Sequence, residues 1–438
     1  MDKKTIENKK NVILIVVDAF RPQNLSMFGY KKETDKNLKK IAKESVLFKQ
    51  CFSSSNSTAP SLMSMFTGML PKNHGIIHQF PYTKEEEIIK MQDNLKFWLP
   101  SYLKERGYET NAIDWIGMWF KDGFDYYEEK EEKQSKIKKF MNIPKVKRFL
   151  LGVPNWIYQI GKKMIKTRAS IGFVPAKETM DLGISRIKKS QKPFFLFMHF
   201  WDTHFPFKTT KFKGSEKKDV DEVLANIKDK SQKEYFKKRV TDINLYSIED
   251  MTEKYNESIK NVDEQIGRLH KFLKKKNLWE DTILIILGDH GTNLTEHGIY
   301  FSSSGLYDDT IHVPLIMHFP GLESKEIDSF VQNTDLPPTI LDYLGYETMD
   351  FDGTSLIETI KNGKNMRDKV FFFDGLCEDI KGVRTKKRKL IIAKNRLCNL
   401  CKSFHHKEFE EYDLEKDPKE NKNVYKENSE LKKFIEDK

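Results

Sequence analysis

Thr58 lies in a stretch of small and hydroxylated residues, 48–75, that differs from the bulky, Lys-rich sequence around it. An apolar run, Leu62–Leu70, begins just after Pro60 and Ser61, and a hydroxyl or a proline before an apolar run indicates the start of a helix. That start would put the Thr58 hydroxyl at a helix N-terminus, where free N–H groups and the helix dipole favour a bound oxyanion. The local pattern leaves a plain helix cap open as the alternative.

Carboxylates and imidazoles follow three continuous apolar runs, 12–17, 193–200 and 282–287, that are typical of strands buried on both faces of a parallel sheet. Ligands in open α/β sheets lie outside the carboxyl ends of the strands. These polar residues are therefore candidates for a metal or phosphate site, although Asp18 taken alone could equally cap a turn. The candidates are Asp18, Asp202, His204, Asp289 and His290.

The elements that must position these candidates alternate between strand and helix. Further strands are expected at 109–116 and 311–319, helices at 93–107 and 255–275, and a helix followed by an edge strand at 37–48. This alternation predicts a doubly wound, mostly parallel α/β sheet flanked by helices over residues 1–365. Short strands with turns between them, closed by a polar helix, predict a small antiparallel subdomain at 366–438.

Two segments differ from the rest of the α/β region. Residues 134–177 contain no acidic residue and eleven Lys or Arg, interleaved with aromatic and apolar side chains. Such a segment fits a basic amphipathic helix on an anionic membrane surface, and a solvated basic face on a docking helix is the alternative. No nucleic-acid-binding motif accompanies the charge, so nucleic acid is not expected as a partner. Residues 208–248 are highly charged and predict a surface excursion or lid.

Composition limits the class of protein. The chain has 438 residues, 38% of them hydrophobic, and a formal net charge of +11. It can therefore bury a large core and favours anionic partners. No 18-residue apolar run is present, so no membrane span is expected. The N-terminal apolar run, Val12–Val17, ends at Asp18 without a small-residue cleavage site, which indicates a strand and not a secretory signal. We therefore expect a cytoplasmic protein, with the basic segment as a means of peripheral contact with the inner membrane face.

Four cysteines in this length do not form a disulfide scaffold. Cys398 and Cys401 are spaced to hold one tetrahedral ion, with His405 and His406 following and Cys377 upstream. A second pair at matching spacing is missing, so the spacing favours reduced thiols without a metal and leaves metal binding open.

Several short motifs occur in a fixed order. Asn11–Asp18 is a strand that ends in an Asp, and Thr58–Gly68 is T-A-P-S-L-M-S-M-F-T-G, ahead of Pro71 and His74-Gly75. The others are Thr34–Leu38, Gly107–Thr110, Asp289–Gly291, Glu296–Gly298, Val313–Ile316 and Tyr412–Glu420. In type and order they resemble the motifs of the sulfatase branch of the alkaline phosphatase superfamily, over nearly the whole chain. The resemblance implies that fold, a metal-dependent ester hydrolase or transferase, and Thr58 at the nucleophile position.

The chain departs from that family's pattern at chemically important positions. A sulfatase of this branch has a Cys or Ser that is oxidised to formylglycine, and the secondary alcohol of Thr58 cannot give that aldehyde. Ala19 replaces the second Asp of the usual pair, and Leu62 replaces the Arg of C-x-P-S-R. Gly117–Phe120 replaces G-K-W-H, whose Lys and His hold the sulfate. A Thr nucleophile occurs in the phosphodiesterases and phospho-group transferases of the superfamily, which this chain resembles more in its nucleophile.

The resemblance implies one divalent cation, held by Asp18, Asp289, His290 and the oxygen of Thr58. Mixed carboxylate and imidazole ligands suit Zn²⁺ or Mn²⁺, and Ca²⁺ and Mg²⁺ also stay open. Thr58 would attack phosphorus, and N–H groups after Pro60 would help hold the equatorial oxygens. His204 would protonate the leaving oxygen or join a second metal. The other candidates for a second metal or for substrate are Asp202, His297 and His312, and a structural role is the alternative for the two histidines.

Three functions therefore stay open. The first is a phosphoester hydrolase or transferase, acting on a phosphodiester or passing a phospho-group to a glycan or lipid. The second is a sulfuric ester hydrolase that works without formylglycine. The third is a catalytically inactive binding protein that keeps the fold. The first two share an anionic phosphoester or sulfoester substrate.

Overall fold

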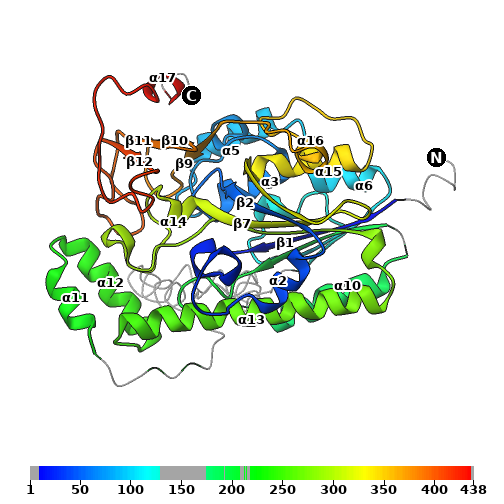
Figure 1. The fold of residues 1–438 in the computed structure, drawn as a ribbon, viewed down its shortest axis with the longest axis horizontal. Coiled ribbons are helices and arrows are strands. Elements are labelled where there is room, and N and C mark those ends of the chain that lie inside the picture. The colour runs from blue at the N-terminus through cyan, green and yellow to red at the C-terminus, as the bar shows by residue number, and fades with distance from the viewer. Residues whose placement is uncertain are drawn as a thin grey trace, which may run out of the picture.

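An eight-stranded sheet forms the centre of the protein, and a four-stranded antiparallel sheet lies beside it (Figure 1). The computed structural model describes residues 9–128, 174–191, 193–207, 212, 214 and 218–435. The strands of the large sheet are β1 Asn11–Val17, β2 Val46–Phe52, β3 Glu109–Ile113, β4 Tyr126–Glu128, β5 Phe194–Phe200, β6 Thr282–Gly288, β7 His312–His318 and β8 Lys325–Gln332. Their order is β4-β3-β5-β1-β6-β7-β2-β8. Only β7 runs against its neighbours, which confirms the mostly parallel α/β sheet.

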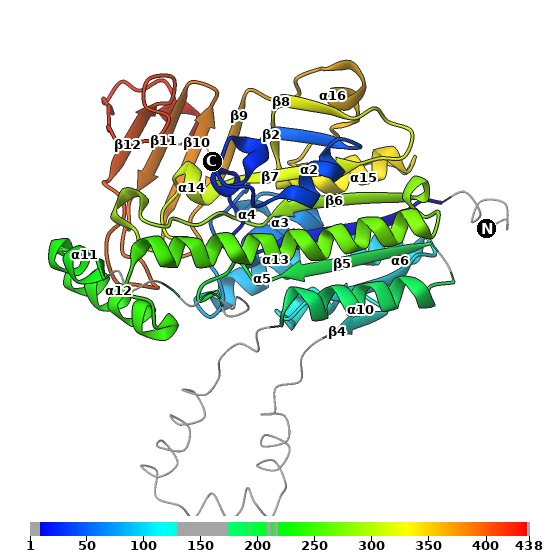
Figure 2. The same cartoon turned by 60° about the horizontal axis from the view of Figure 1, so that its bottom comes forward.

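Helices cover both faces of this sheet (Figure 2). The α-helices are α2 Lys36–Ala42, α3 Thr58–Thr67, α4 Pro71–His74, α5 Glu85–Asn94, α6 Leu99–Glu105, α10 Ala176–Lys189, α11 Val220–Asn226, α12 Lys230–Ile243, α13 Ile248–Lys275, α14 Asp308–Ile311, α15 Leu336–Tyr343, α16 Ile357–Asn362 and α17 Lys432–Ile435. The short 3₁₀ helices are η1 Pro22–Asn24, η2 Ser26–Phe28, η3 Met118–Lys121, η4 Trp279–Asp281, η5 Glu296–Gly298 and η6 Asn333–Asp335.

The central strand β1 shows why the apolar runs form buried strands. Successive side chains of a strand point to opposite faces of the sheet. Val12, Leu14 and Val16 enter the core under α3, α5, α6, α15 and α16. Ile13, Ile15 and Val17 enter the core under α2, α10, α12 and α13. A strand with an apolar core on each side needs apolar residues at every position, and the sequence of β1 meets that need.

The small sheet follows the large one in the chain. Its strands are β9 Lys369–Phe373, β10 Ile380–Thr385, β11 Arg388–Ala393 and β12 Phe409–Asp413, in the order β12-β11-β10-β9. A third apolar cluster joins it to the large sheet through Phe52 at the end of β2 and Phe372 in β9. A parallel bridge between Ser55 and Phe373 adds a direct backbone link. The small sheet therefore lies at the carboxyl edge of the large one, where the candidate residues were expected.

Two details differ from the sequence-based expectations. The strand expected at the sheet edge, β2, lies between β7 and β8, because β8 pairs with it in parallel and takes the edge. The helix expected at 93–107 is two helices, α5 and α6, and Pro100 lies in the first turn of α6, where its missing N–H is harmless.

The charged segment 208–248 contains α11 and α12 in its described part. Phe236 and Val240 of α12 are buried in the core that also holds α13. The segment is therefore packed onto the domain and is more than a surface excursion.

The basic segment 134–177 falls outside the described residues except for its last four positions. Its membrane contact stays a prediction. Among the described helices, none is both long and apolar enough to cross a bilayer.

Phe66 of α3 provides a test of this packing. It is fully buried and contacts the rings of Trp98 and Phe197 at 5.0 Å between centroids. Phe66→Ala should lower the free energy of unfolding by about 3–5 kcal/mol, because the cavity cannot close between two packed layers. Ile89→Ala, at a position that is 52% exposed on α5, is the control and should change it by less than about 1 kcal/mol. Urea unfolding followed by circular dichroism measures both, and equal losses would contradict this account.

Candidate active site

Thr58 is the first residue of α3, as the sequence predicted, and its helix is tied to the end of β6. Ser57 is extended and Gly68 ends the helix in a left-handed conformation at φ 70°. Ser61, one turn inside the helix, donates a hydrogen bond of 2.6 Å to the carbonyl of Asp289. It also accepts one of 2.9 Å from the side chain of Asn333. These bonds fix the helix start against the strand end that carries the candidate ligands.

Asp18, Asp289 and His290 surround the Thr58 hydroxyl. Thr58 Oγ1 lies 3.5 Å from Asp18 Oδ2 and 3.3 Å from His290 Nε2. His290 Nε2 lies 3.7 Å from Asp18 Oδ1 and 3.5 Å from Asp289 Oδ2. Both carboxylates are fully buried, and the exposed fraction of Thr58 is 5%. The structure therefore brings together all four residues that were expected to form the metal site.

These atoms face one another mainly as acceptors. His290 Nδ1 donates to the carbonyl of Gly291 at 2.7 Å, so Nε2 of the neutral ring presents a lone pair to the two carboxylates. Asp18 Oδ1 and Asp289 Oδ2 are buried and have no hydrogen-bond partner among the described residues. Burial, and then the charge of Asp289, raise the pKa of Asp18 well above its ordinary value. A bound cation would relieve the repulsion between these groups.

His199 is a candidate ligand that the sequence reasoning missed. It lies in β5, and its Nε2 is 4.0 Å from Asp18 Oδ2. Its Nδ1 donates to Asp114 Oδ1 at 2.9 Å, which leaves a lone pair on Nε2. Ligand atoms of Asp18, His199 and Asp289 lie within 4.8 Å of one another. The available signal was a single imidazole inside the otherwise apolar strand 194–200.

The residues present fit a divalent cation. Buried carboxylate oxygens and imidazole nitrogens are ligands for Zn²⁺ or Mn²⁺, and the orphaned oxygens of Asp18 and Asp289 give the site its charge. Thr58 closes this ligand set on the side that borders the pocket. The Thr58 hydroxyl and the candidate cation site therefore both face the pocket.

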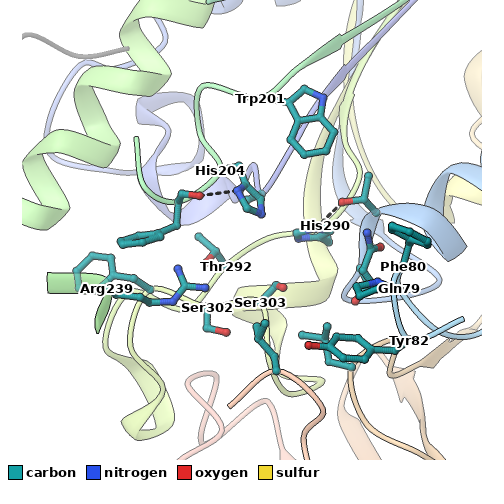
Figure 3. Close-up of a pocket in the computed structure, with 18 residues that line it drawn as sticks. Gln79, Phe80, Tyr82, Trp201, His204, Arg239, His290, Thr292, Ser302 and Ser303 are labelled. Carbon is teal, nitrogen blue, oxygen red and sulfur yellow. Dashed lines mark hydrogen bonds between the residues drawn. The ribbon is translucent and has the colours of Figure 1, made fainter. Parts of the chain in front are cut away.

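A pocket of about 240 Å³ opens over Thr58 and His290 (Figure 3). Trp201 and His204 line it after β5, Arg239 lines it from α12, and the 79–82 and 301–303 loops form other walls. Among the described residues of the lining, Arg239 is the one with a permanent positive charge. Its Nε and Nη1 are buried without a hydrogen-bond partner in the described structure. An anionic group in the pocket would give them one.

His204 is held with one nitrogen toward the pocket side. Its Nδ1 donates to the carbonyl of Phe205 at 2.6 Å, so Nε2 carries the lone pair. Burial, and then the charge of Arg239, lower the pKa of His204 to about 4. His204 is therefore neutral at pH 7 in the free protein, and a negative charge beside it would favour the protonated form.

The structure does not bring the second-metal candidates to Thr58. Asp202 accepts hydrogen bonds from Ala176 N at 3.2 Å and from Asn261 Nδ2 at 2.7 Å, so it anchors α10 to α13. His297 stacks on Tyr307, and His312 Nε2 donates to the carbonyl of Lys49 at 2.9 Å. None of Asp202, His297 and His312 lines the pocket. Their contacts are those of residues that hold the surrounding elements.

Three of the positions where the chain departs from the family pattern lie in different surroundings. Ala19 lies in the pocket wall in a left-handed conformation at φ 53°. Leu62 is fully buried in α3. Phe120 is also fully buried and packs 6.1 Å from Trp98, between ring centroids. Leu62 and Phe120 therefore belong to the core.

The helix N–H groups do not lie free for an oxyanion as expected. The N–H of Ser61, the first after Pro60, donates to the carbonyl of Ser57 at 3.2 Å. The N–H of Ala59 donates to Gln79 Oε1 at 2.8 Å. The expectation failed for these two groups because the helix closes its own first turn at Ser61 and the Gln79 side chain caps Ala59.

A hydroxyl beside a candidate cation site, at the carboxyl edge of an α/β sheet, is compatible with a metal-dependent ester hydrolase. Residues 10–346 match the family model described as Sulfatase, and residues 295–437 match the one described as N-sulphoglucosamine sulphohydrolase, C-terminal. The chain belongs to the sulfatase family and is a hydrolase.

Relatives and solved structures agree over most of the chain. An arylsulfatase of Clostridium perfringens is 25% identical over 460 residues, spanning 95% of this chain and 90% of the relative. A phosphonate monoester hydrolase of Agrobacterium radiobacter has a similar fold, with a TM-score of 0.64 and 20% identity over 97% of this chain and 93% of its own. A structure in complex with D-glucosamine-2-N,6-O-disulfate has a TM-score of 0.66 and 19% identity, over 98% and 96%. The two structures share the fold with this chain.

Removal of one carboxylate tests the metal site. Asp289→Asn should weaken Mn²⁺ binding by at least about 100-fold, because it removes a charged ligand and not only an outer contact. Asp263→Asn is the control, since Asp263 is a buried carboxylate that accepts N–H groups of α2 far from the pocket. Calorimetric titration of chelator-treated protein measures both. Equal affinities for the two variants would contradict the assignment.

Proposed function

We propose that the protein is a metal-dependent hydrolase or transferase of phosphoesters with Thr58 as its nucleophile. The observation that carries the proposal is the position of the Thr58 hydroxyl, within 3.5 Å of Asp18 and His290 and in the wall of the pocket. A divalent cation bound beside it would lower the pKa of the hydroxyl and polarise the ester group.

Four side chains take part in the proposed reaction, namely those of Thr58, Asp18, His204 and Arg239. The hydroxyl of Thr58 donates its proton toward Asp18 Oδ2 and attacks phosphorus, so that a bond from Oγ1 to phosphorus forms as the ester bond breaks. The leaving oxygen takes a proton from His204 Nε2. Arg239 pairs with an oxygen of the anionic group. Water, or the hydroxyl of a glycan or lipid, then gives its proton to His204 Nε2 and attacks phosphorus. Thr58 takes back the proton from Asp18 as the bond from Oγ1 to phosphorus breaks.

Several facts support phosphorus over sulfur. Thr58 cannot become formylglycine, and the positions of the sulfate-holding Lys and His are Met118 and Phe120. Phe120 is buried in the core and is unavailable to a substrate. The fold itself does not separate the two, because it is shared by a phosphonate monoester hydrolase and by the structure in complex with a sulfated glucosamine.

Sulfuric ester hydrolysis without formylglycine is the second candidate, because the full-length relative from Clostridium perfringens is an arylsulfatase. A catalytically inactive binding protein is the third. The anionic ester is common to both catalytic candidates.

The proposed substrates include phosphoesters of a lipid or of a lipid-linked glycan. The basis is the basic segment 134–177, which would hold the protein at an anionic surface on the cytoplasmic side. This part of the proposal rests on sequence alone, as does the cytoplasmic location.

Two variants of the nucleophile separate the candidates. Thr58→Ala should reduce phosphodiester turnover by at least about 1000-fold, and Thr58→Ser should keep much of it, since serine retains a hydroxyl. The assay pairs bis-p-nitrophenyl phosphate with p-nitrophenyl sulfate, and intact mass after substrate detects the phosphate adduct. Full turnover by Thr58→Ala would exclude the covalent route. Cleavage of the sulfate alone would favour the second candidate, and no metal and no turnover would favour the third.

The leaving group tests the part played by His204. His204→Gln should slow a diester with an alkoxide leaving group by about 100-fold or more and change p-nitrophenolate release little, because only the poor leaving group needs a proton. In the wild type, kcat for the alkyl diester should fall as pH rises through the pKa of His204 in the complex, since a general acid must be protonated. Steady-state rates across pH measure both effects. Equal slowing for the two leaving groups would remove His204 as the acid.

A further inference from the structure

Two cysteines and one histidine converge in the C-terminal subdomain, away from Thr58, and a third cysteine lies beside them. Ligand atoms of Cys398, Cys401 and His405 lie within 4.8 Å of one another. Cys401 Sγ and His405 Nε2 are 2.8 Å apart. Cys377 lies across an antiparallel bridge from Cys398, which places the two residues side by side. Cys377, between β9 and β10, is therefore the candidate for a fourth donor.

The backbone builds a tight loop around these side chains. A bridge between Leu397 and Phe404 closes it, and the N–H of Cys398 donates to the carbonyl of Ser403 at 2.9 Å. Inside it, the N–H of Lys402 donates to the carbonyl of Cys398 at 2.9 Å, with Lys402 at φ 59°. This fold turns both cysteines of the pair to the same side as His405.

The two adjacent histidines have different tasks. His406 uses both ring nitrogens within the core, since Nδ1 pairs with Glu410 at 2.8 Å and Nε2 accepts the N–H of Leu306 at 3.0 Å. His405 directs Nε2 at the sulfur of Cys401. Only His405 is therefore free to act as a fourth ligand beside the three thiols.

The cluster is buried and poor in strong donors. Cys377 and Cys398 are fully buried, and Cys401 has an exposed fraction of 5%. The hydroxyl of Ser304, 3.6 Å from Cys398 Sγ, and the N–H of Ser403 beside Cys401 can donate to thiolates. These two groups would help to stabilise anionic sulfur.

We propose that Cys377, Cys398, Cys401 and His405 bind one structural Zn²⁺, separate from the cation site at Thr58. Four-ligand sets of three thiolates and one imidazole form closed tetrahedral zinc sites, in which neighbouring donors lie about 3.5–3.8 Å apart. On binding, three thiol protons leave to solvent as three zinc–sulfur bonds form, and His405 contributes its lone pair. The complex has a net charge of −1, which the Ser304 and Ser403 donors stabilise.

The position of the cluster gives the ion a structural task. Leu376, next to Cys377, and Leu400, inside the Cys398–Cys401 loop, both line the substrate pocket. Cys401 and His405 also border a small cavity with Tyr235, the residue whose hydroxyl accepts a hydrogen bond from Arg239. A zinc ion would therefore fix the part of the pocket wall formed by Leu376 and Leu400 and support the position of Arg239.

The test counts zinc in a chain whose catalytic cation site has been disabled. Asp289→Asn protein, purified without added metal, should keep one zinc per chain after dialysis against a weak chelator. Adding Cys398→Ser should lower the zinc affinity by more than the about 10–100-fold that loss of an outer contact costs. Adding Cys51→Ala, which removes a buried thiol of β2, should leave the zinc content per chain unchanged. Elemental analysis by mass spectrometry measures all three.

Two measurements on the wild-type protein cover the case in which Cys398→Ser does not fold. Titration with an organomercurial should release zinc in proportion to the thiols captured, and replacement by Co²⁺ should give a thiolate-to-cobalt charge-transfer band. Retained zinc that survives thiol capture would overturn the proposal. So would a metal-free protein with four free thiols, or a mass two hydrogens lower that maps to a Cys398–Cys401 disulfide. None of these results depends on Thr58 or on turnover.

Discussion

The mutual repulsion of buried lone pairs at the carboxyl edge of the large sheet is the constraint on which the rest of the structure depends. Asp18 and Asp289 are fully buried, and each has one carboxylate oxygen without a hydrogen-bond partner in the described part of the chain. Sheet register brings them together, because Val17 pairs with Gly288 and the two Asp residues follow directly. A buried carboxylate is unfavourable unless a cation or a proton compensates it. The neighbouring elements therefore form a frame that keeps acceptors together for a cation.

Sequence predicted those parts of the site that depend on local rules. A continuous apolar run marks a buried strand, and the residue after it lies at the ligand edge, so Asp18, Asp289 and His290 could be found. Thr58 followed from a helix start. His199 could not be found in this way. Its position near Asp18 depends on the pairing of β5 with β1, which puts His199 opposite Val16. The order of strands around β2 was also beyond local rules, because β8 mixes polar and apolar residues and gives a weak strand signal.

A residue that is close in sequence to the site motif does not always lie in the site. His297 follows the Asp289-His290 motif by a few residues, yet its ring stacks on Tyr307 outside the pocket. The reverse holds for Arg239, which lies in a charged segment without any motif and enters the pocket from α12. Residues that line a pocket can come from any element that reaches it. The packing of α12 onto the core, through Phe236 and Val240, places Arg239 in the pocket lining.

The two clusters of ligands differ in a way that fits their tasks. The set at Thr58 consists of hard and borderline donors and borders the pocket, so under the proposed function a substrate would meet the cation and Thr58 from one side. The set around Cys398 consists mainly of sulfur and is complete without a substrate, which suits an ion that only holds structure. Leu376 and Leu400 connect the second set to the first, because they form the pocket wall. The geometry at phosphorus would then depend on both sheets, one carrying the nucleophile and the other limiting where the ester can lie.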